Sequence, residues 1–188
     1  MTPGRRAVLA GAGAAGLGLV LWRGGALDEW LPPAEVRARG GEPGTLGADE
    51  VRTLEAFAEV LLPGAAEAGV AQFVDHHLTV PAAESLLMIR YLDVPPPYAD
   101  FYRGGLAALD AYSRATAGRA FHELAPARAE GLVKEIAAAP PPRWRGPPSP
   151  LLYFAVRADA VDVVYGTEAG FEKLGVPYQP HILPPSKW

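Results

Sequence analysis

The four histidines are the residues best suited to metal binding or proton transfer: His76, His77, His122 and His181. His76 and His77 are adjacent, so on a helix their side chains point about 100° apart. A metal site built on one helix needs ligands that share a face, as at positions i and i+4. No histidine has a second histidine or a carboxylate at that spacing. The sequence therefore predicts no metal site.

Nucleophiles for covalent catalysis are few. The chain has no cysteine, which excludes thiolate catalysis and cysteine-held iron–sulfur or c-type haem groups within it. None of Ser85, Ser113, Ser149 and Ser186 lies in a G-x-S-x-G turn. Pairs of carboxylates can meet in space from any part of a chain, so acid–base catalysis by such a pair stays open. We predict no catalytic residue and no cofactor-binding residue in this chain.

A glycine-rich motif near the N-terminus could indicate dinucleotide binding. Residues 11–16 form G-x-G-x-x-G, and Asp28 and Glu29 lie where a ribose-binding acid is expected. Such a site needs a buried strand directly before the glycines, and only residues 7–9 are available there, directly after two arginines. It also needs further βαβ units, whereas the rest of the chain predicts helices. The glycines therefore favour a weakly apolar export segment over a nucleotide site.

The first 26 residues have the layout of an export signal. Arg5 and Arg6 precede an uncharged run over residues 7–22, and an arginine pair followed by one free residue and two apolar ones is typical of twin-arginine signals. The run is short for a helix that spans a bilayer, which needs about 20 residues. Residues 24–26, Gly-Gly-Ala, form a weak cleavage motif, so removal of the segment and retention as a poor anchor both stay open. We predict a twin-arginine signal over residues 1–26, with Arg5 and Arg6 as its key residues.

The remaining sequence predicts one all-α domain over residues 48–188. Residues 27–47 are dense in proline and glycine and are expected to form a linker. Apolar residues at helical spacing begin at residue 48. The expected helices cover residues 48–62, 68–78, 82–91, 97–117, 127–138 and 150–164. We therefore expect a compact, irregular domain of about five to six helices, followed by an extended and hydrophobic C-terminal tail.

Charge argues against a nucleic-acid partner. The net charge is −4, and the longest basic cluster is Arg143-Trp144-Arg145. Binding to nucleic acid needs a larger basic surface gathered on one face of the protein. We predict no nucleic-acid binding.

Aromatic residues of the loop over residues 140–150 and of the C-terminal tail are candidates for contact with a partner protein. Tryptophan and tyrosine often supply the anchoring contacts of an interface. The alternative is that the tail packs against its own domain. The predicted interface residues are Trp144, Tyr165, Phe171, Tyr178 and Trp188.

Several short motifs between residues 48 and 178 are informative when they are taken together. They are Leu61-Leu62-Pro63-Gly64, Ala68-Gly69-Val70, Phe73-Val74-Asp75, Phe101-Tyr102-Arg103-Gly104-Gly105-Leu106, Leu109-Asp110, Tyr165-Gly166, Gly170-Phe171 and Leu174-Gly175. In this combination the chain resembles the gluconate 2-dehydrogenase subunit 3 family. One departure is the Thr-Glu pair at residues 167–168, where many members of that family have Gly-Asn.

The resemblance implies a non-catalytic accessory subunit that is exported to the periplasm or to the outer face of the cytoplasmic membrane. In that family the small subunit binds a large FAD-dependent (GMC-type) dehydrogenase subunit, supports its maturation and carries the twin-arginine signal for the folded pair. FAD is then expected in the partner, with a cytochrome c subunit as the electron acceptor. This chain would hold no cofactor.

Two other functions are alternatives to that of an accessory subunit. A stand-alone exported enzyme or small-ligand-binding helical protein would have a deep pocket lined by converging polar groups. A structural envelope protein would be held by its N-terminal helix, but the glycine-rich residues 11–18 argue against such an anchor.

Overall fold

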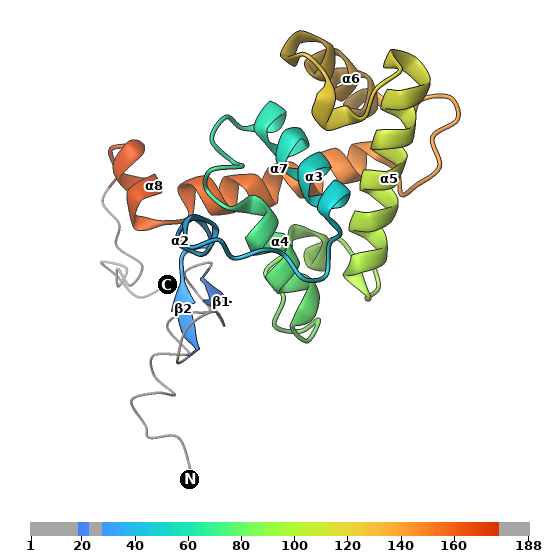
Figure 1. Cartoon of the computed structure of the whole chain (residues 1–188). Coiled ribbons are helices and arrows are strands. Elements are labelled where there is room, and N and C mark those ends of the chain that lie inside the picture. The colour runs from blue at the N-terminus through green and yellow to red at the C-terminus, as the bar shows by residue number, and fades with distance from the viewer. Residues whose placement is uncertain (1–18, 23–27, 177–188) are drawn as a thin grey trace, which may run out of the picture.

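The computed structural model describes residues 19–22 and 28–176. The predicted export residues Arg5 and Arg6 and the predicted interface residues Tyr178 and Trp188 lie outside these ranges. The described residues form seven α-helices, two short 3-10 helices and one antiparallel pair of strands (Figure 1). The expected all-α fold is therefore confirmed, with a small sheet added at the N-terminal side.

The helices are α2 (Pro33–Ala38), α3 (Ala48–Leu61), α4 (Val70–Thr79), α5 (Tyr98–Ala117), α6 (Pro126–Ala138), α7 (Ser149–Tyr165) and α8 (Glu168–Lys173), with the 3-10 helices η2 (Met88–Tyr91) and η3 (Phe121–Glu123). Strands β1 (Val20–Trp22) and β2 (Glu29–Leu31) pair so that Val20 lies opposite Leu31. Five of the six expected helices are confirmed, with ends shifted by one or two residues. The two helices that were not expected, α2 and α8, have 6 residues each.

Helices α3 and α7 form the centre of the domain. Helix α3 packs against α4, α5, α6 and α7, while α7 also contacts α4, α5, α6 and α8. Figure 1 shows α7 crossing the molecule behind α3, with α5 and α6 at one end and α8 and the strands at the other. The fully buried side chains at this centre include Leu54, Phe57, Ala58, Leu152, Ala155 and Val156.

Helices α5 and α7 cross at a glycine. A Cβ atom at Gly105 would lie 2.5 Å from Leu152 Cδ1, and Leu152 is fully buried. Glycine at this position therefore allows the two helix backbones to approach closely. A second glycine, Gly118, ends α5 in the left-handed conformation with φ 73°, which is the usual way that glycine stops a helix.

The helix predicted over residues 82–91 is wrong. Only Met88–Tyr91 is helical, as η2, and Leu87 directly before it is extended. The Met88 backbone N–H donates to Asp159 Oδ1 of α7 at 2.9 Å. Leu87 and Ile89 are nevertheless buried, because a short apolar run can place side chains in a core without forming a helix.

Residues 27–47 contain regular structure where a linker was expected. Strand β2 and helix α2 lie within them, and Leu46 is buried in the core. The Asp75 carboxylate of α4 accepts hydrogen bonds from the backbone N–H groups of Gly44 at 2.9 Å, Thr45 at 2.8 Å and Leu46 at 2.7 Å. The loop is thus fixed by a side chain on a distant helix, which the local composition of the loop does not reveal.

Within the described residues, no helix combines the length and the apolar character needed to cross a membrane. Strand β1 lies within residues 1–26, the segment that the sequence predicts as an export signal. Residues 20–22 of that segment are thus part of the small sheet.

Candidate partner-binding surface

Trp144, a predicted interface residue, lies largely inside the domain. Its side chain is 9% exposed, and its indole N–H donates to the Pro147 carbonyl at 2.7 Å. Its ring also meets the Tyr112 ring of α5 edge-on, with centroids 6.5 Å apart. Trp144 thus holds the proline-rich loop between α6 and α7 against α5 and offers little free surface, so a role in a partner interface stays a prediction.

Tyr165 and Phe171 lie where the chain turns from α7 into α8. Tyr165 is partly buried and packs against the core, and Phe171 is also partly exposed. The Thr167 hydroxyl accepts the Gly170 backbone N–H at 3.1 Å and caps the start of α8. Both aromatic side chains therefore occupy a corner at which partner contact is sterically possible.

Helix α7 carries apolar side chains on its outer face as well as its inner face. Phe154 is 48% exposed and Val161 is 39% exposed, and Ala158 and Tyr165 continue the same row at helical spacing. Past α8, Leu174 and Val176 are also exposed. Arg157 and Asp162, which are also exposed, flank this apolar row on α7. We call Phe154, Ala158, Val161 and Tyr165 the outer face of α7.

Phe154 and Val161 are apolar, and the structure nevertheless places both on the exposed side of the helix predicted over residues 150–164. The signal was present in the sequence, because the apolar residues of 150–164 cover more of the helix circumference than one stripe needs. An amphipathic surface helix would have had polar residues at these positions.

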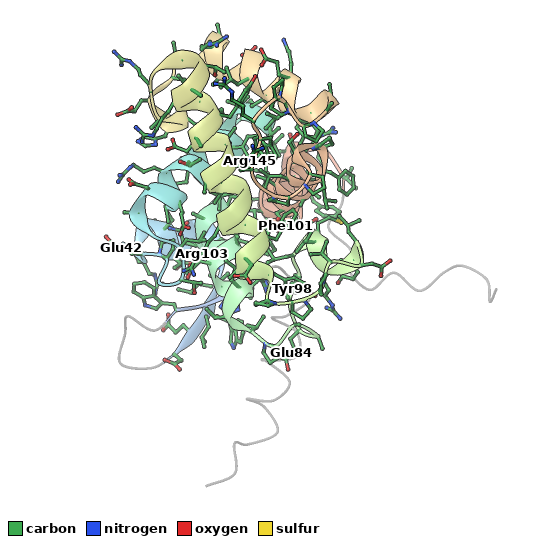
Figure 2. All side chains as sticks on the ribbon, turned by 90° about the vertical axis from the view of Figure 1, so that its right-hand side faces the viewer. Glu42, Glu84, Tyr98, Phe101, Arg103 and Arg145 are labelled. Atoms are coloured by element: carbon green, nitrogen blue, oxygen red, sulfur yellow. The ribbon has the colours of Figure 1, made fainter. Side chains whose placement is uncertain are left out.

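The face of α5 differs from the outer face of α7. In Figure 2, α5 runs along the front of the molecule, with Arg103 on one side and Phe101 on the other. Phe101 is buried, while the Arg103 guanidinium donates to the Thr45 carbonyl and lies 3.7 Å from the Glu50 carboxylate. The Arg103 guanidinium on this face is therefore already paired within the chain.

One cavity lies between the strands and α4, with a volume of about 490 Å³. Its lining includes Trp30, Gln72, Asp75 and His76. The Gln72 amide N–H donates to the Gly41 carbonyl at 3.1 Å, and the three backbone bonds described above occupy the Asp75 carboxylate. Gln72 Oε1 is the one buried polar side-chain atom of this described lining without a hydrogen-bond partner, and a single such atom does not make the converging polar groups of a ligand site.

The histidines do not form a metal site in the part of the chain that the structure describes. The rings of His76 and His77 meet edge-on with centroids 5.0 Å apart, and His76 also meets Trp30. No group of three or more histidine or carboxylate side chains among the described residues could hold a metal ion. His77 is buried against Phe73, and desolvation, together with the neighbouring His76, lowers its pKa to about 4.

Asp159 is a fully buried carboxyl group at the centre of the domain. It accepts the Met88 N–H and the Tyr102 hydroxyl. Burial raises the pKa of Asp159 to about 7, although both hydrogen bonds act in the opposite direction. The same burial, with the charge of Asp159, raises the pKa of Tyr102 well above its usual range. This pair joins η2, α5 and α7, and neither group is exposed to a substrate.

The described residues thus define a small all-α protein with a packed core and an apolar face that lacks a covering element. Comparison with protein families matches residues 48–184 to the family described as gluconate 2-dehydrogenase subunit 3. The match covers more than half of the chain, and the chain belongs to this family. Comparisons with curated proteins and with solved structures gave no match.

Family membership confirms the resemblance seen in the sequence. It makes the chain an accessory subunit of a dehydrogenase complex, which associates with other subunits of that complex. The matched range begins at the first residue of α3 and extends past the last described residue. The strands and α2 therefore precede the family domain.

Proposed function

We propose that this chain binds the large FAD-dependent (GMC-type) catalytic subunit of a dehydrogenase, supports its maturation and carries it out of the cytoplasm by the twin-arginine route. The family match over residues 48–184 carries the proposal, because it identifies the chain as a dehydrogenase subunit. The pair Arg5-Arg6 and the uncharged run after it support the export role. The exported pair then works in the periplasm or at the outer face of the cytoplasmic membrane.

In this function the chain performs no redox chemistry. FAD lies in the large subunit, and electrons pass from there to a cytochrome c subunit. This chain supplies a preformed surface, and a surface already fixed by its own core loses little conformational entropy on binding. The inner face of α7 is fully packed, so its outer face is presented on a rigid helix.

The export role is tested by the double substitution Arg5→Lys with Arg6→Lys in the native host. Lysine keeps the positive charge but lacks the planar guanidinium group, so we expect this chain and the large subunit to stay in the cytoplasm. Fractionation followed by immunoblotting of both subunits measures this. The matched control is Arg143→Lys with Arg145→Lys, two exposed arginines of the α6–α7 loop.

Normal export of the Arg5→Lys, Arg6→Lys chain would refute the twin-arginine role. Dehydrogenase activity in the purified single chain would instead favour the enzyme alternative.

A further inference from the structure

Strand β1 belongs both to the described fold and to the predicted export segment over residues 1–26. The strand comprises the last three residues of the uncharged run over residues 7–22, and it pairs with β2 in antiparallel register. Val20 is 2% exposed and belongs to the hydrophobic core. Residues of the export segment are thus part of the packed domain.

Trp22 ties the strand to helix α2 and to the loop that follows it. A Cβ atom at Gly41 would lie 2.8 Å from Trp22 Cζ3 and 2.4 Å from Val36 Cγ1. The Trp22 ring and the Val36 side chain therefore both lie directly against the Gly41 backbone. Val36 is itself buried, so the end of the uncharged run and α2 form one continuous apolar layer.

The weak cleavage motif at residues 24–26 follows this strand in the sequence. Cleavage there would remove β1, and with it the cover of Val36 and Leu31. It would also leave the backbone N–H and C=O groups of β2 without their strand partners, at an exposed sheet edge. Removal of the segment would therefore damage the fold of the domain that it has exported.

We infer that the N-terminal segment is not cleaved at residues 24–26, and that the β1–β2 hairpin keeps it attached to the mature protein as a membrane tether. This inference rests on the proposed export function. The retained uncharged run outside the described residues covers only residues 7–18, which is shorter than the about 20 residues that a bilayer-spanning helix needs.

The first test determines the N-terminus of the protein isolated from the membrane fraction of its native host. We expect mass spectrometry to find peptides that continue unbroken through residues 20–28. A mature N-terminus at residues 24–28 in the exported protein would overturn the inference, while leaving the proposed export function intact.

The second test does not depend on export. A specific protease site is placed in the full chain in place of residues 23–27, and the purified protein is cut and separated from its N-terminal fragment. Loss of β1 from the core is expected to lower Tm by roughly 5 °C relative to the uncut chain with the same insertion. An unchanged Tm would show that the hairpin is dispensable and would overturn the inference.

The two tests separate this inference from the proposed function. If Arg5→Lys with Arg6→Lys leaves localisation unchanged, the export proposal fails, and the Tm difference still decides whether the hairpin holds the segment.

Discussion

Two buried ionisable side chains, Asp159 and His77, act on stability in opposite directions as pH changes. The pKa of Asp159 is raised from 3.8 to about 7, so its contribution is fully present below pH 3.8 and is lost as pH rises through about 7. The pKa of His77 is lowered from 6.5 to about 4, so its contribution is present above pH 6.5 and is lost as pH falls through about 4. Between about pH 4 and 6.5 the two contributions therefore oppose each other.

Replacing Asp159 with asparagine should remove the loss of stability at rising pH. Asparagine keeps an acceptor for the Met88 N–H but does not ionise, and the pKa difference of Asp159 corresponds to ~4 kcal/mol between pH 4 and 7. Chemical denaturation at a series of pH values measures this, and Asp159→Asn should gain relative stability toward pH 7. Asp159→Ala, which leaves the Met88 N–H without its acceptor, should instead lose about 1–3 kcal/mol. If the free energy of unfolding of Asp159→Asn depends on pH as it does in the native chain, the raised pKa of Asp159 is not the cause.

Replacing His77 with glutamine should flatten the acid side of the same profile. Protonation of His77 below pH 6.5 favours the unfolded chain, where the ring is hydrated. His77→Gln cannot take up this proton, so its free energy of unfolding should fall less than that of the native chain between pH 6.5 and 4. His76→Gln is the neighbouring control, and an equally steep fall in His77→Gln would show that another group is responsible.

At the scale of elements, the crossing of α5 and α7 leaves no room for a side chain at residue 105. Gly105→Ala would place a Cβ atom against the fully buried Leu152, and overpacking of this kind costs about 1–3 kcal/mol. Gly131→Ala in α6 is the matched control, since no atom lies within 4 Å of the added Cβ, and it should stabilise by about 0.5–1 kcal/mol. Thermal denaturation measures the Tm of both variants. An equal change in Tm for Gly105→Ala and Gly131→Ala would contradict the close packing of α5 against α7 at residue 105.

The elements that the sequence predicted well are those fixed by local signals. The helices over Ala48–Leu61, Tyr98–Ala117 and Pro126–Ala138 have apolar stripes and are bounded by proline or glycine. The failure at residues 82–91 and the regular structure found within residues 27–47 lie where carboxylates from distant helices bind the backbone. Asp159 and Asp75 gave no local signal for those contacts.

The interface residues stay a prediction, but the surroundings of their side chains could not be read from the sequence. Sequence reasoning selected Trp144 because tryptophan is common in interfaces, but its ring is held inside the α6–α7 loop by the Pro147 carbonyl and by Tyr112. It did not select Phe154 or Val161, whose exposure depends on which side of α7 the other helices cover. Residue type alone could not decide between the two sides.

At the scale of the whole molecule, we expect the outer face of α7 to contact the large subunit of the proposed complex. Phe154→Ser with Val161→Ser should reduce co-purification of the large subunit about tenfold, which corresponds to a loss of about 1.4 kcal/mol of binding free energy, an effect of the size that a few central interface residues carry. Both side chains are exposed, so Tm should change little. Affinity purification from cells that produce both subunits measures the yield.

Arg128→Ser with Lys134→Ser, on the exposed side of α6, is the control for this measurement. Unchanged co-purification in the α7 variant would place the docking surface elsewhere. A large fall in its Tm would show that these two side chains serve the core.

The strands and α8 lie at the same end of the molecule, opposite α5 and α6 (Figure 1). Residues of α2 and α8 line one groove there, so the first and last helices of the described residues are neighbours in space. The inferred membrane tether would place this end of the subunit near the bilayer and the end with α5 and α6 away from it. In that arrangement, an epitope inserted in the α5–α6 connection would project away from the lipid and stay accessible to antibody.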